Sequence, residues 1–123
     1  MKILVHDYSG HPFQVQLSRS LSLEGHDVLH LFSASIQSPR GALEKTDEDP
    51  DGFSVKSISL GRNVDKYSLF RRRKQEREYG ELLYNAIECF APDVVIASNT
   101  PPDAFQGLIK AKKNLGIPYV YWL

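Results

Sequence analysis

The sequence predicts an α/β domain built on an open, doubly wound parallel sheet of five strands and three helices, in the strand order 3-2-1-4-5. Short apolar runs rich in β-branched residues alternate with stretches that have helical spacing. Clusters of glycine, proline and small polar residues separate these segments. Residues 94–97 are apolar throughout, which is typical of a strand buried on both faces of a parallel sheet.

The first strand is expected over residues 2–6, a short apolar run with β-branched side chains. Phe13, Leu17 and Leu21 then recur every four residues, which predicts a helix with one apolar face. A glycine after this stretch suits the left-handed residue that ends a helix. The second strand is expected over residues 27–32.

Residues 34–52 show no helical stripe and are strongly acidic over residues 44–51, so we expect a long solvated loop there. The third strand is expected over residues 53–60. Its apolar alternation slips between Val55 and Ile58, as at a sheet edge or a β-bulge. Because the loop replaces a helix, we expect the sheet to be poorly covered near it, or to need a partner.

A long helix is expected from about residue 66 to residue 90, where Pro92 ends it. Its back half has a clean apolar stripe, whereas its basic front half has no apolar face. The fourth strand, third helix and fifth strand are expected over residues 93–97, 104–115 and 117–121. Right-handed crossovers place the first helix on one face of the sheet and the other two on the opposite face.

The composition argues against several classes of protein. Lysine and arginine total 15, as do aspartate and glutamate, so a formal net charge of zero does not indicate a nucleic-acid binder. The longest apolar run is far too short to span a bilayer, and the N-terminus lacks the apolar core of a signal peptide. The single cysteine, Cys89, excludes an internal disulfide. We expect a reducing, cytoplasmic location, no cofactor and no bound metal.

Ligands of doubly wound sheets bind beyond the carboxyl ends of the strands, where the strand order reverses. Here the order reverses between the first and fourth strands, so the loops of residues 7–12 and 98–102 meet there. Gly10 would let the backbone approach a ligand at a helix start, which attracts anions, or it is a plain tight turn. Asn99 and Thr100 would bind a hydroxylated ligand, or cap the next helix. The candidate binding residues are Ser9, Gly10, His11, Asn99 and Thr100.

The sequence lacks the motifs of a dinucleotide site, a P-loop and a nucleophilic catalytic site. The first loop has one glycine instead of Gly-x-Gly-x-x-Gly, and the second strand ends without an acid for a ribose, so a dinucleotide site is poorly supported. No Gly-Lys-Ser or Gly-Lys-Thr occurs, which excludes a P-loop. Ser9 and His11 are close in sequence, but nothing orients them for nucleophilic catalysis. We therefore assign no catalytic residue.

A basic run near the start of the long helix is a second candidate site, for a membrane surface. It follows Tyr67, Leu69 and Phe70, and cations beside apolar side chains suit an anionic bilayer. The alternative is a solvated helix face, because basic side chains here have acids four residues later. The basic run consists of Arg71, Arg72, Arg73 and Lys74.

Several motifs in order give a family resemblance. Ser9-Gly10-His11-Pro12 follows the first strand, and the pattern L-x-x-x-G-H-x-V spans residues 21–28. Together they resemble the N-terminal domain of the family 4 retaining glycosyltransferases, whose GT-B architecture has two Rossmann-like domains facing a cleft. Residues 92–98 and 116–120 are similar to the fourth and fifth strands of that domain. The likeness is greatest to bacterial cell-surface polysaccharide enzymes of the colanic-acid type.

The resemblance implies transfer of a sugar from a nucleotide-sugar donor to a sugar or lipid-linked acceptor. It implies that the first domain holds the acceptor and that its glycine loop, here Ser9, Gly10 and His11, approaches the donor diphosphate. Asn99 and Thr100 carry over more loosely. Many relatives have two glycines in this loop, where this chain has Ser9-Gly10. In some relatives the basic helix touches the membrane, so a peripheral place at the inner membrane is implied as well.

The resemblance also implies that residues 1–123 are part of the first Rossmann-like domain and that the donor-binding C-terminal domain is absent. We therefore expect this chain to be inactive alone. The alternative from a different class is a small, non-enzymatic α/β binding or regulatory domain that dimerises through its uncovered sheet face. A third reading is a peripheral membrane module that uses the basic run.

Overall fold

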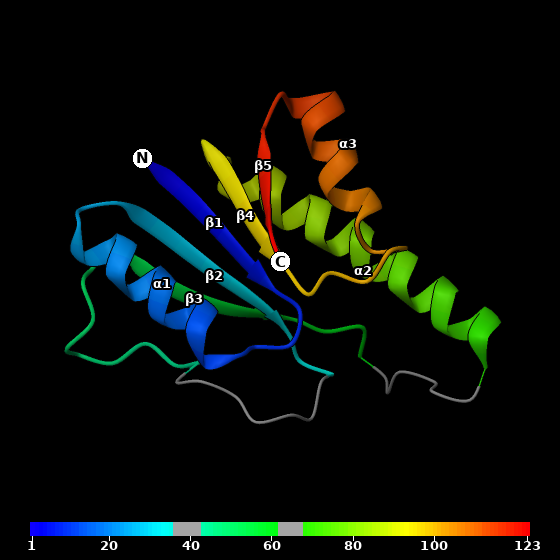
Figure 1. The fold of residues 1–123 in the computed structure, drawn as a ribbon, viewed down its shortest axis with the longest axis horizontal. Coiled ribbons are helices and arrows are strands. Elements are labelled where there is room, and N and C mark those ends of the chain that lie inside the picture. Colours follow the sequence, from blue (N-terminus) through cyan, green and yellow to red (C-terminus); the bar gives the residue numbers. More distant parts are fainter. Residues whose placement is uncertain (36–42, 62–67) are drawn as a thin grey trace.

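The described residues of the computed structural model, 1–35, 43–61 and 68–123, form one parallel sheet with helices on both faces (Figure 1). The sheet has five strands in the order β3-β2-β1-β4-β5. All four strand pairs are parallel. The predicted fold class and strand order are confirmed. The elements are β1 (Lys2–Asp7), α1 (Pro12–Leu23), β2 (Asp27–Ser33), β3 (Phe53–Ile58), α2 (Leu69–Phe90), β4 (Val94–Ser98), α3 (Gln106–Leu115) and β5 (Tyr119–Trp122).

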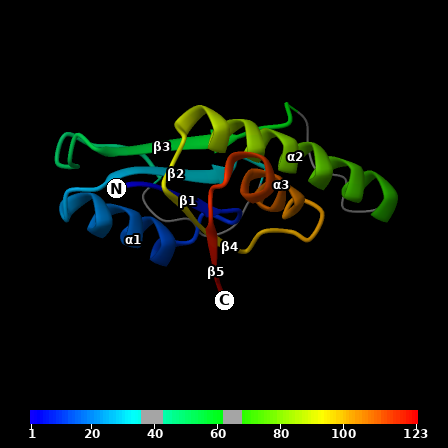
Figure 2. The ribbon, with the colours of Figure 1, turned by 90° about the horizontal axis from the view of Figure 1, so that it is seen from above.

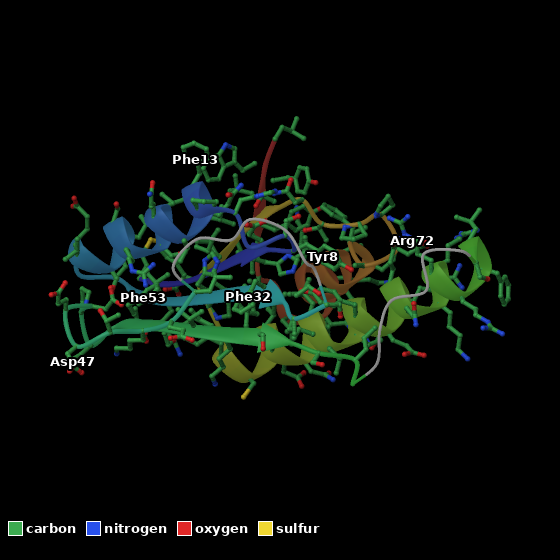
Figure 3. All side chains as sticks on the ribbon, turned by 90° about the horizontal axis from the view of Figure 1, so that it is seen from below. Tyr8, Phe13, Phe32, Asp47, Phe53 and Arg72 are labelled. Carbon is green, nitrogen blue, oxygen red and sulfur yellow. The ribbon has the colours of Figure 1, made fainter. Side chains whose placement is uncertain are left out.

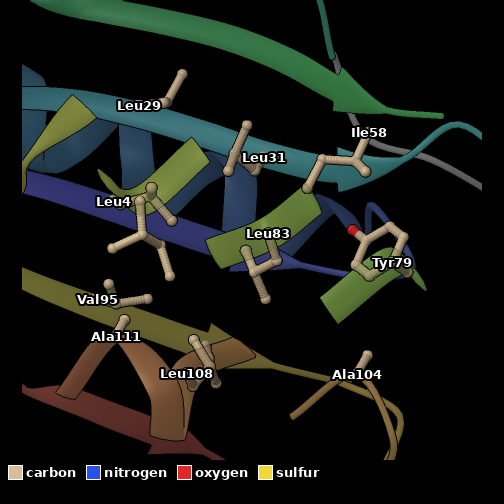
Figure 4. Packing of buried hydrophobic residues seen from close by; sticks show 12 residues of the cluster. Leu4, Leu29, Leu31, Ile58, Tyr79, Leu83, Val95, Ala104, Leu108 and Ala111 are labelled. Carbon is tan, nitrogen blue, oxygen red and sulfur yellow. The ribbon is translucent and has the colours of Figure 1, made fainter. Parts of the chain in front are cut away.

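The helices cover the two faces as right-handed crossovers predict, with α1 on one face and α2 and α3 on the other (Figure 2). Successive side chains of a strand point to opposite faces, so β1 sends Leu4 toward α2 and α3 and sends Ile3 and Val5 toward α1. The core under α2 and α3 is the larger one (Figure 4). Its buried members include Leu4, Leu29, Leu31, Tyr79, Leu83, Ile87, Val95 and Leu108.

The long helix α2 has two different halves. Its back half buries Tyr79, Leu83 and Ile87, as the apolar stripe predicts. Its N-terminal half extends past the strands (Figure 1). Ser68 caps the helix by accepting a hydrogen bond from the Arg71 N–H, and Ala91 ends it at a positive φ of 52°. The expected start at residue 66 lies outside the described residues.

The helices α2 and α3 touch backbone to backbone. A Cβ atom added to Gly107 would lie 2.3 Å from the carbonyl oxygen of Gly80, and one added to Gly80 would lie 2.9 Å from the carbonyl oxygen of Ala104. Only residues without a side chain fit at this crossing. The two glycines therefore set how closely α3 and the segment before it pack on α2.

Residues 43–52 form neither helix nor strand, as expected for the described part of the loop. Arg19 of α1 holds this segment in place. Its Nε donates to Asp49 Oδ1 at 2.9 Å, and its Nη2 donates to the carbonyl oxygen of Glu44 at 2.9 Å. The same guanidinium lies over the ring of Phe53, 4.7 Å from the centroid. The acidic loop is thus tied to α1.

The sheet is exposed in a different place from the one expected. The helix α1 packs on β1, β2 and β3, and Phe53 at the start of β3 is fully buried. Within the described strands, the large apolar side chains that remain exposed are on β5, where Val120 is 56% and Trp122 is 40% accessible. Their strand partners, Ile96 and Ser98, place them on the α1 face. The face with one helix is therefore partly uncovered, as expected, but over β5 instead of near the loop, because α1 packs on β1, β2 and β3.

Candidate functional site

The carboxyl ends of β1, β2 and β4 meet at the predicted edge of the sheet. The register pairs Asp7 with Ser98, the last residues of β1 and β4. The Tyr8 N–H donates to the Ser98 carbonyl at 3.4 Å, and the Ser33 N–H donates to the Tyr8 carbonyl at 3.2 Å. These bonds fasten the first loop to the strands on either side of β1. The strand order reverses at this edge, which is called the switch-point edge below.

Asp7 is the centre of the switch-point edge, and its side chain is completely buried. Its Oδ1 accepts hydrogen bonds from the Ser9 N–H at 3.2 Å and from Asn99 Nδ2 at 2.9 Å. Its Oδ2 accepts from the His11 N–H. Both oxygens act as acceptors, as in an ionised carboxylate. One side chain therefore joins the first loop, the start of α1 and the loop after β4.

The predicted binding residues divide into two groups at this edge. The first loop turns at Gly10, which has a φ of +72°, and its N–H donates to the Asp7 carbonyl at 3.3 Å. Asn99 is exposed and left-handed, with a φ of +53°, a conformation that asparagine tolerates. Because its amide nitrogen donates to Asp7, its carbonyl oxygen Oδ1 is left to accept a bond from elsewhere. Thr100, by contrast, is buried and 7% accessible.

Thr100 belongs to a buried hydrogen-bonded chain on the α2 side of the sheet. His6 is completely buried, with Nε2 2.8 Å from the Tyr79 hydroxyl and Nδ1 3.1 Å from Thr100 Oγ1. Thr100 in turn donates to the carbonyl of Ser98 at 3.4 Å. This order assigns the proton of His6 to Nδ1, with Nε2 accepting from Tyr79. These hydrogen bonds anchor the loop after β4 to α2. Thr100 does not cap α3.

Burial controls the protonation of these side chains. Desolvation, followed by the nearby His30, lowers the pKa of His6 to about 3. Desolvation also lowers the pKa of His30 to about 4, although the charge of Asp7 opposes the shift. Burial raises the pKa of Tyr79 well above its usual value, so its hydroxyl stays protonated and donates a hydrogen bond to His6. Both buried histidines are neutral at pH 7.

The sequence does not predict a site at Asp7, His6 or Tyr79. An acid at the end of a buried strand, directly before a glycine loop, was the available signal for Asp7. No such signal exists for the pair of His6 and Tyr79, because 73 residues separate them along the chain. Tyr8 also packs edge-on against Tyr79, with ring centroids 4.9 Å apart, and lies at the strand ends in Figure 3.

A surface groove of about 450 Å³ runs beside α1. It lies between α1 and the acidic loop, and it includes the first residue of α1, directly after the switch-point loop. Its lining mixes apolar and hydrogen-bonding side chains, which suits a ligand with both kinds of surface. The residues that line it are Pro12, Val15, Gln16, Arg19, Thr46, Glu48 and Asp49.

The basic run lies on the half of α2 that extends past the strands. Leu69 and Phe70 precede it and are 75% and 82% accessible, which is unusual for large apolar side chains. The position of Tyr67 lies outside the described residues. The run approaches the switch-point edge through Arg72, whose charge acts on Tyr8 of the first loop. Arg72, labelled in Figure 3, contacts Glu76 with Nε 3.1 Å from Oε1, one of the predicted pairs.

Other members of this region have partners in a neighbouring segment. The Nε atoms of Arg73 and Arg77 lie 3.2 and 3.7 Å from the carboxylate oxygens of Asp103. Glu81, which the helical spacing pairs with Arg77, contacts Lys110 of α3 at 2.9 Å. Part of the positive charge is therefore already balanced by acids of the chain itself.

Searches for two other features among the described residues were negative. Within residues 1–35, 43–61 and 68–123, no group of three or more histidine, cysteine or acidic side chains is arranged to hold a metal ion. In the same part of the chain, no helix combines the length and the apolar character needed to cross a membrane.

Comparisons with known proteins identify the fold. No protein-family model matches this chain, and no curated protein matches its sequence. Among solved structures, the C-terminal domain of the PF1911 hydrogenase from Pyrococcus furiosus is similar over 99% of this chain and 90% of its own, with a TM-score of 0.67 and 18% identity. The chain thus belongs to a class of α/β domains that occurs in proteins of different activity.

Glycosyltransferases contain the same fold as part of a longer chain. A glycosyltransferase from Rickettsia africae is similar over 98% of this chain and 28% of its own, with a TM-score of 0.57 and 16% identity. SsfS6, a glycosyltransferase from a Streptomyces species, is similar over 98% of this chain and 38% of its own, with a TM-score of 0.52 and 23% identity. This chain therefore spans about a third of each of these two enzymes.

Proposed function

We propose that this chain is the acceptor side of a glycosyltransferase that takes its sugar from a nucleotide-sugar donor. The observation that carries the proposal is the switch-point edge. There the exposed Asn99 presents an unused carbonyl oxygen at the place where ligands bind in doubly wound sheets. A groove along α1, the helix that begins directly after the first loop, has room for the rest of a sugar-like molecule. Two glycosyltransferases with this fold add support, although a fold alone does not define a function.

In this proposal residues 1–123 are part of the first Rossmann-like domain of a GT-B enzyme, and a second domain supplies the donor pocket. A structure of SsfS6 holds thymidine diphosphate, which supports a nucleotide-sugar donor. The acceptor hydroxyl and the donor diphosphate are the two groups that would approach the loops of Ser9, Gly10, His11 and Asn99, with Thr100 buried behind them. The finer assignment, a retaining family 4 enzyme of bacterial cell-surface polysaccharide synthesis in the cytoplasm, rests on the sequence motifs.

Asn99→Ala is expected to weaken the binding of a neutral glycoside to this chain by about tenfold, because one hydrogen bond to the ligand is lost. Isothermal titration with a panel of methyl glycosides measures this. Asn114→Ala, at an exposed position of α3, is the matched control and should leave the affinity unchanged. Equal affinity for both variants would contradict the site.

The chain alone should transfer no sugar from any nucleotide sugar, and measurable transfer would overturn its assignment as one side of an enzyme.

The basic run supports a second role, attachment to an anionic membrane surface. The specific observation is that Leu69 and Phe70 are exposed next to it, so one end of α2 combines apolar insertion with positive charge. Two such signals are what stable surface binding requires.

Replacing residues 71–74 by glutamine is expected to abolish co-sedimentation of the chain with vesicles that contain anionic lipid, and Leu69→Ser with Phe70→Ser should weaken it. The first change removes the attraction to the headgroups, and the second removes the apolar contact. Lys112→Gln with Lys113→Gln, two exposed changes on α3, is the control. If the variants sediment like the unaltered chain, the membrane role is wrong.

The remaining alternative is a non-enzymatic domain that dimerises through its uncovered sheet face. Val120 and Trp122 mark the exposed part of that face. A concentration-dependent dimer in sedimentation velocity, lost in Trp122→Ser, together with no glycoside binding, would favour this alternative over the glycosyltransferase.

A further inference from the structure

The backbone N–H groups of the first loop are already occupied. The Tyr8 N–H donates to the Ser98 carbonyl, and the Gly10 N–H donates to the Asp7 carbonyl. The N–H groups of Ser9 and His11 donate to the two carboxylate oxygens of Asp7. In this conformation, residues 8–11 offer no backbone donor to a ligand.

The position of the Asp7 carboxylate is one that would otherwise suit a phosphate. The start of a helix carries partial positive charge, and loop N–H groups there commonly bind an anion. Here α1 begins at Pro12, directly after His11. The His11 N–H donates a hydrogen bond to Asp7. Asp7 supplies the negative charge and the oxygen acceptors from within the chain, and it is fully buried. A phosphate at this place would have to displace it or lie beside a second negative charge.

We propose that Asp7 holds the place of a phosphate at the switch-point edge, so that this edge selects an uncharged, hydroxyl-bearing group and excludes a phosphate from the first loop. The proposal rests on the function proposed above and deepens it. It assigns the acceptor hydroxyl, and not the donor diphosphate, to the loop of Ser9, Gly10 and His11.

Asp7 also determines what the ligand meets. By accepting from Asn99 Nδ2 at 2.9 Å, it fixes the amide so that Oδ1, a pure acceptor, remains for the ligand. An acceptor oxygen bonds a hydroxyl group but repels the oxygens of a phosphate at neutral pH. Asp7 therefore acts as a specificity-determining residue through Asn99, without touching the ligand.

The test is a gain of phosphate binding when the carboxylate is removed. In Asp7→Ala the loop N–H groups lose their acceptor, and inorganic phosphate should raise the melting temperature by about 5 °C relative to sodium chloride of equal ionic strength. The unaltered chain should show no such rise. Asp7→Asn should not gain it either, because its amide still fills the space. Asp93→Ala is the matched control, since Asp93 also accepts a backbone N–H, at the opposite edge of the sheet.

Amide chemical shifts make the test independent of how stable the Asp7 variants are. In the unaltered chain, phosphate and pyrophosphate should leave the amide signals of residues 9–11 in place. If they move these signals, or if Asp7→Ala folds and gains no phosphate response, the inference is wrong and the glycosyltransferase proposal still stands. If Asp7→Ala gains phosphate binding but no glycoside binds the unaltered chain, the inference holds and the proposed function fails.

Discussion

Gly107→Ala is expected to lower the free energy of unfolding by about 3 kcal/mol, the upper part of the range for an overpacked contact. The new Cβ would lie 2.3 Å from the carbonyl oxygen of Gly80, which is backbone and has no rotamer to change. The helix α3 must then move away from α2 and take Leu108 and Ala111 out of the core. Urea denaturation followed by circular dichroism measures the loss.

The expected sign is opposite to that of helix propensity, which favours alanine over glycine by about 1 kcal/mol in a helix. Asn114→Ala in the same helix is the control, because it is exposed and should be neutral or slightly stabilising. A Gly107→Ala protein as stable as the unaltered chain would show that the two helices are not in backbone contact.

Stability is expected to fall steeply between pH 6.5 and pH 4.5, because two buried histidines must stay neutral in the folded state. Burial lowers the pKa of His6 to about 3 and that of His30 to about 4, whereas both titrate near 6.5 when unfolded. In this window the unfolded chain binds more protons, so the free energy of unfolding decreases as the pH falls. Each histidine contributes a limiting slope of about 1.4 kcal/mol per pH unit.

Each buried histidine faces a different set of groups. His6 contacts Tyr79 and Thr100, and His30 contacts Ser18, with Asp7 and Arg19 acting on it through their charge. His6→Gln and His30→Gln should each reduce the slope of the unfolding free energy against pH, measured by urea denaturation, by up to about 1.4 kcal/mol per pH unit. This is the contribution of one proton. A slope that does not respond to either buried histidine would contradict this account of their burial.

The fold was predictable because its signals are local. Apolar runs, the Phe13 to Leu21 stripe, Pro92 and the glycine turns fix the order of the elements, and the crossover rule fixes their faces. Placing two candidate loops together at the switch point needed nothing more than this order. Boundaries moved by one or two residues, as at α3, whose first turn begins at Gln106 instead of residue 104.

The chemistry of the site was less predictable, since it depends on pairs of residues distant in the sequence. The contact of Asp7 with Asn99 joins residues 92 positions apart, and that of His6 with Thr100 joins residues 94 apart. The sequence offers Asn99 and Thr100 the same two roles, ligand binding or helix capping, with capping favoured for Thr100. The structure separates them, because the loop after β4 turns at the left-handed, exposed Asn99 and places Thr100 against His6 in the core under α2.

The uncovered part of the sheet was misplaced for a similar reason. The sequence of residues 34–52 shows that a helix is missing there. It does not show that α1 packs on β1, β2 and β3. The position of α1 depends on the packing of Arg19 against Asp49 and Phe53. The bare surface is therefore found over β5 and not beside the acidic loop.

The most direct test of the account is a titration of this chain with a neutral glycoside, followed by amide chemical shifts. The amide signals that move should belong to residues 8–11 and 98–100, on the two loops that Asp7 joins. Asn99→Ala should remove these changes. Changes confined to another surface, or none with any glycoside at millimolar concentration, would contradict the assignment of the switch-point edge as the acceptor site.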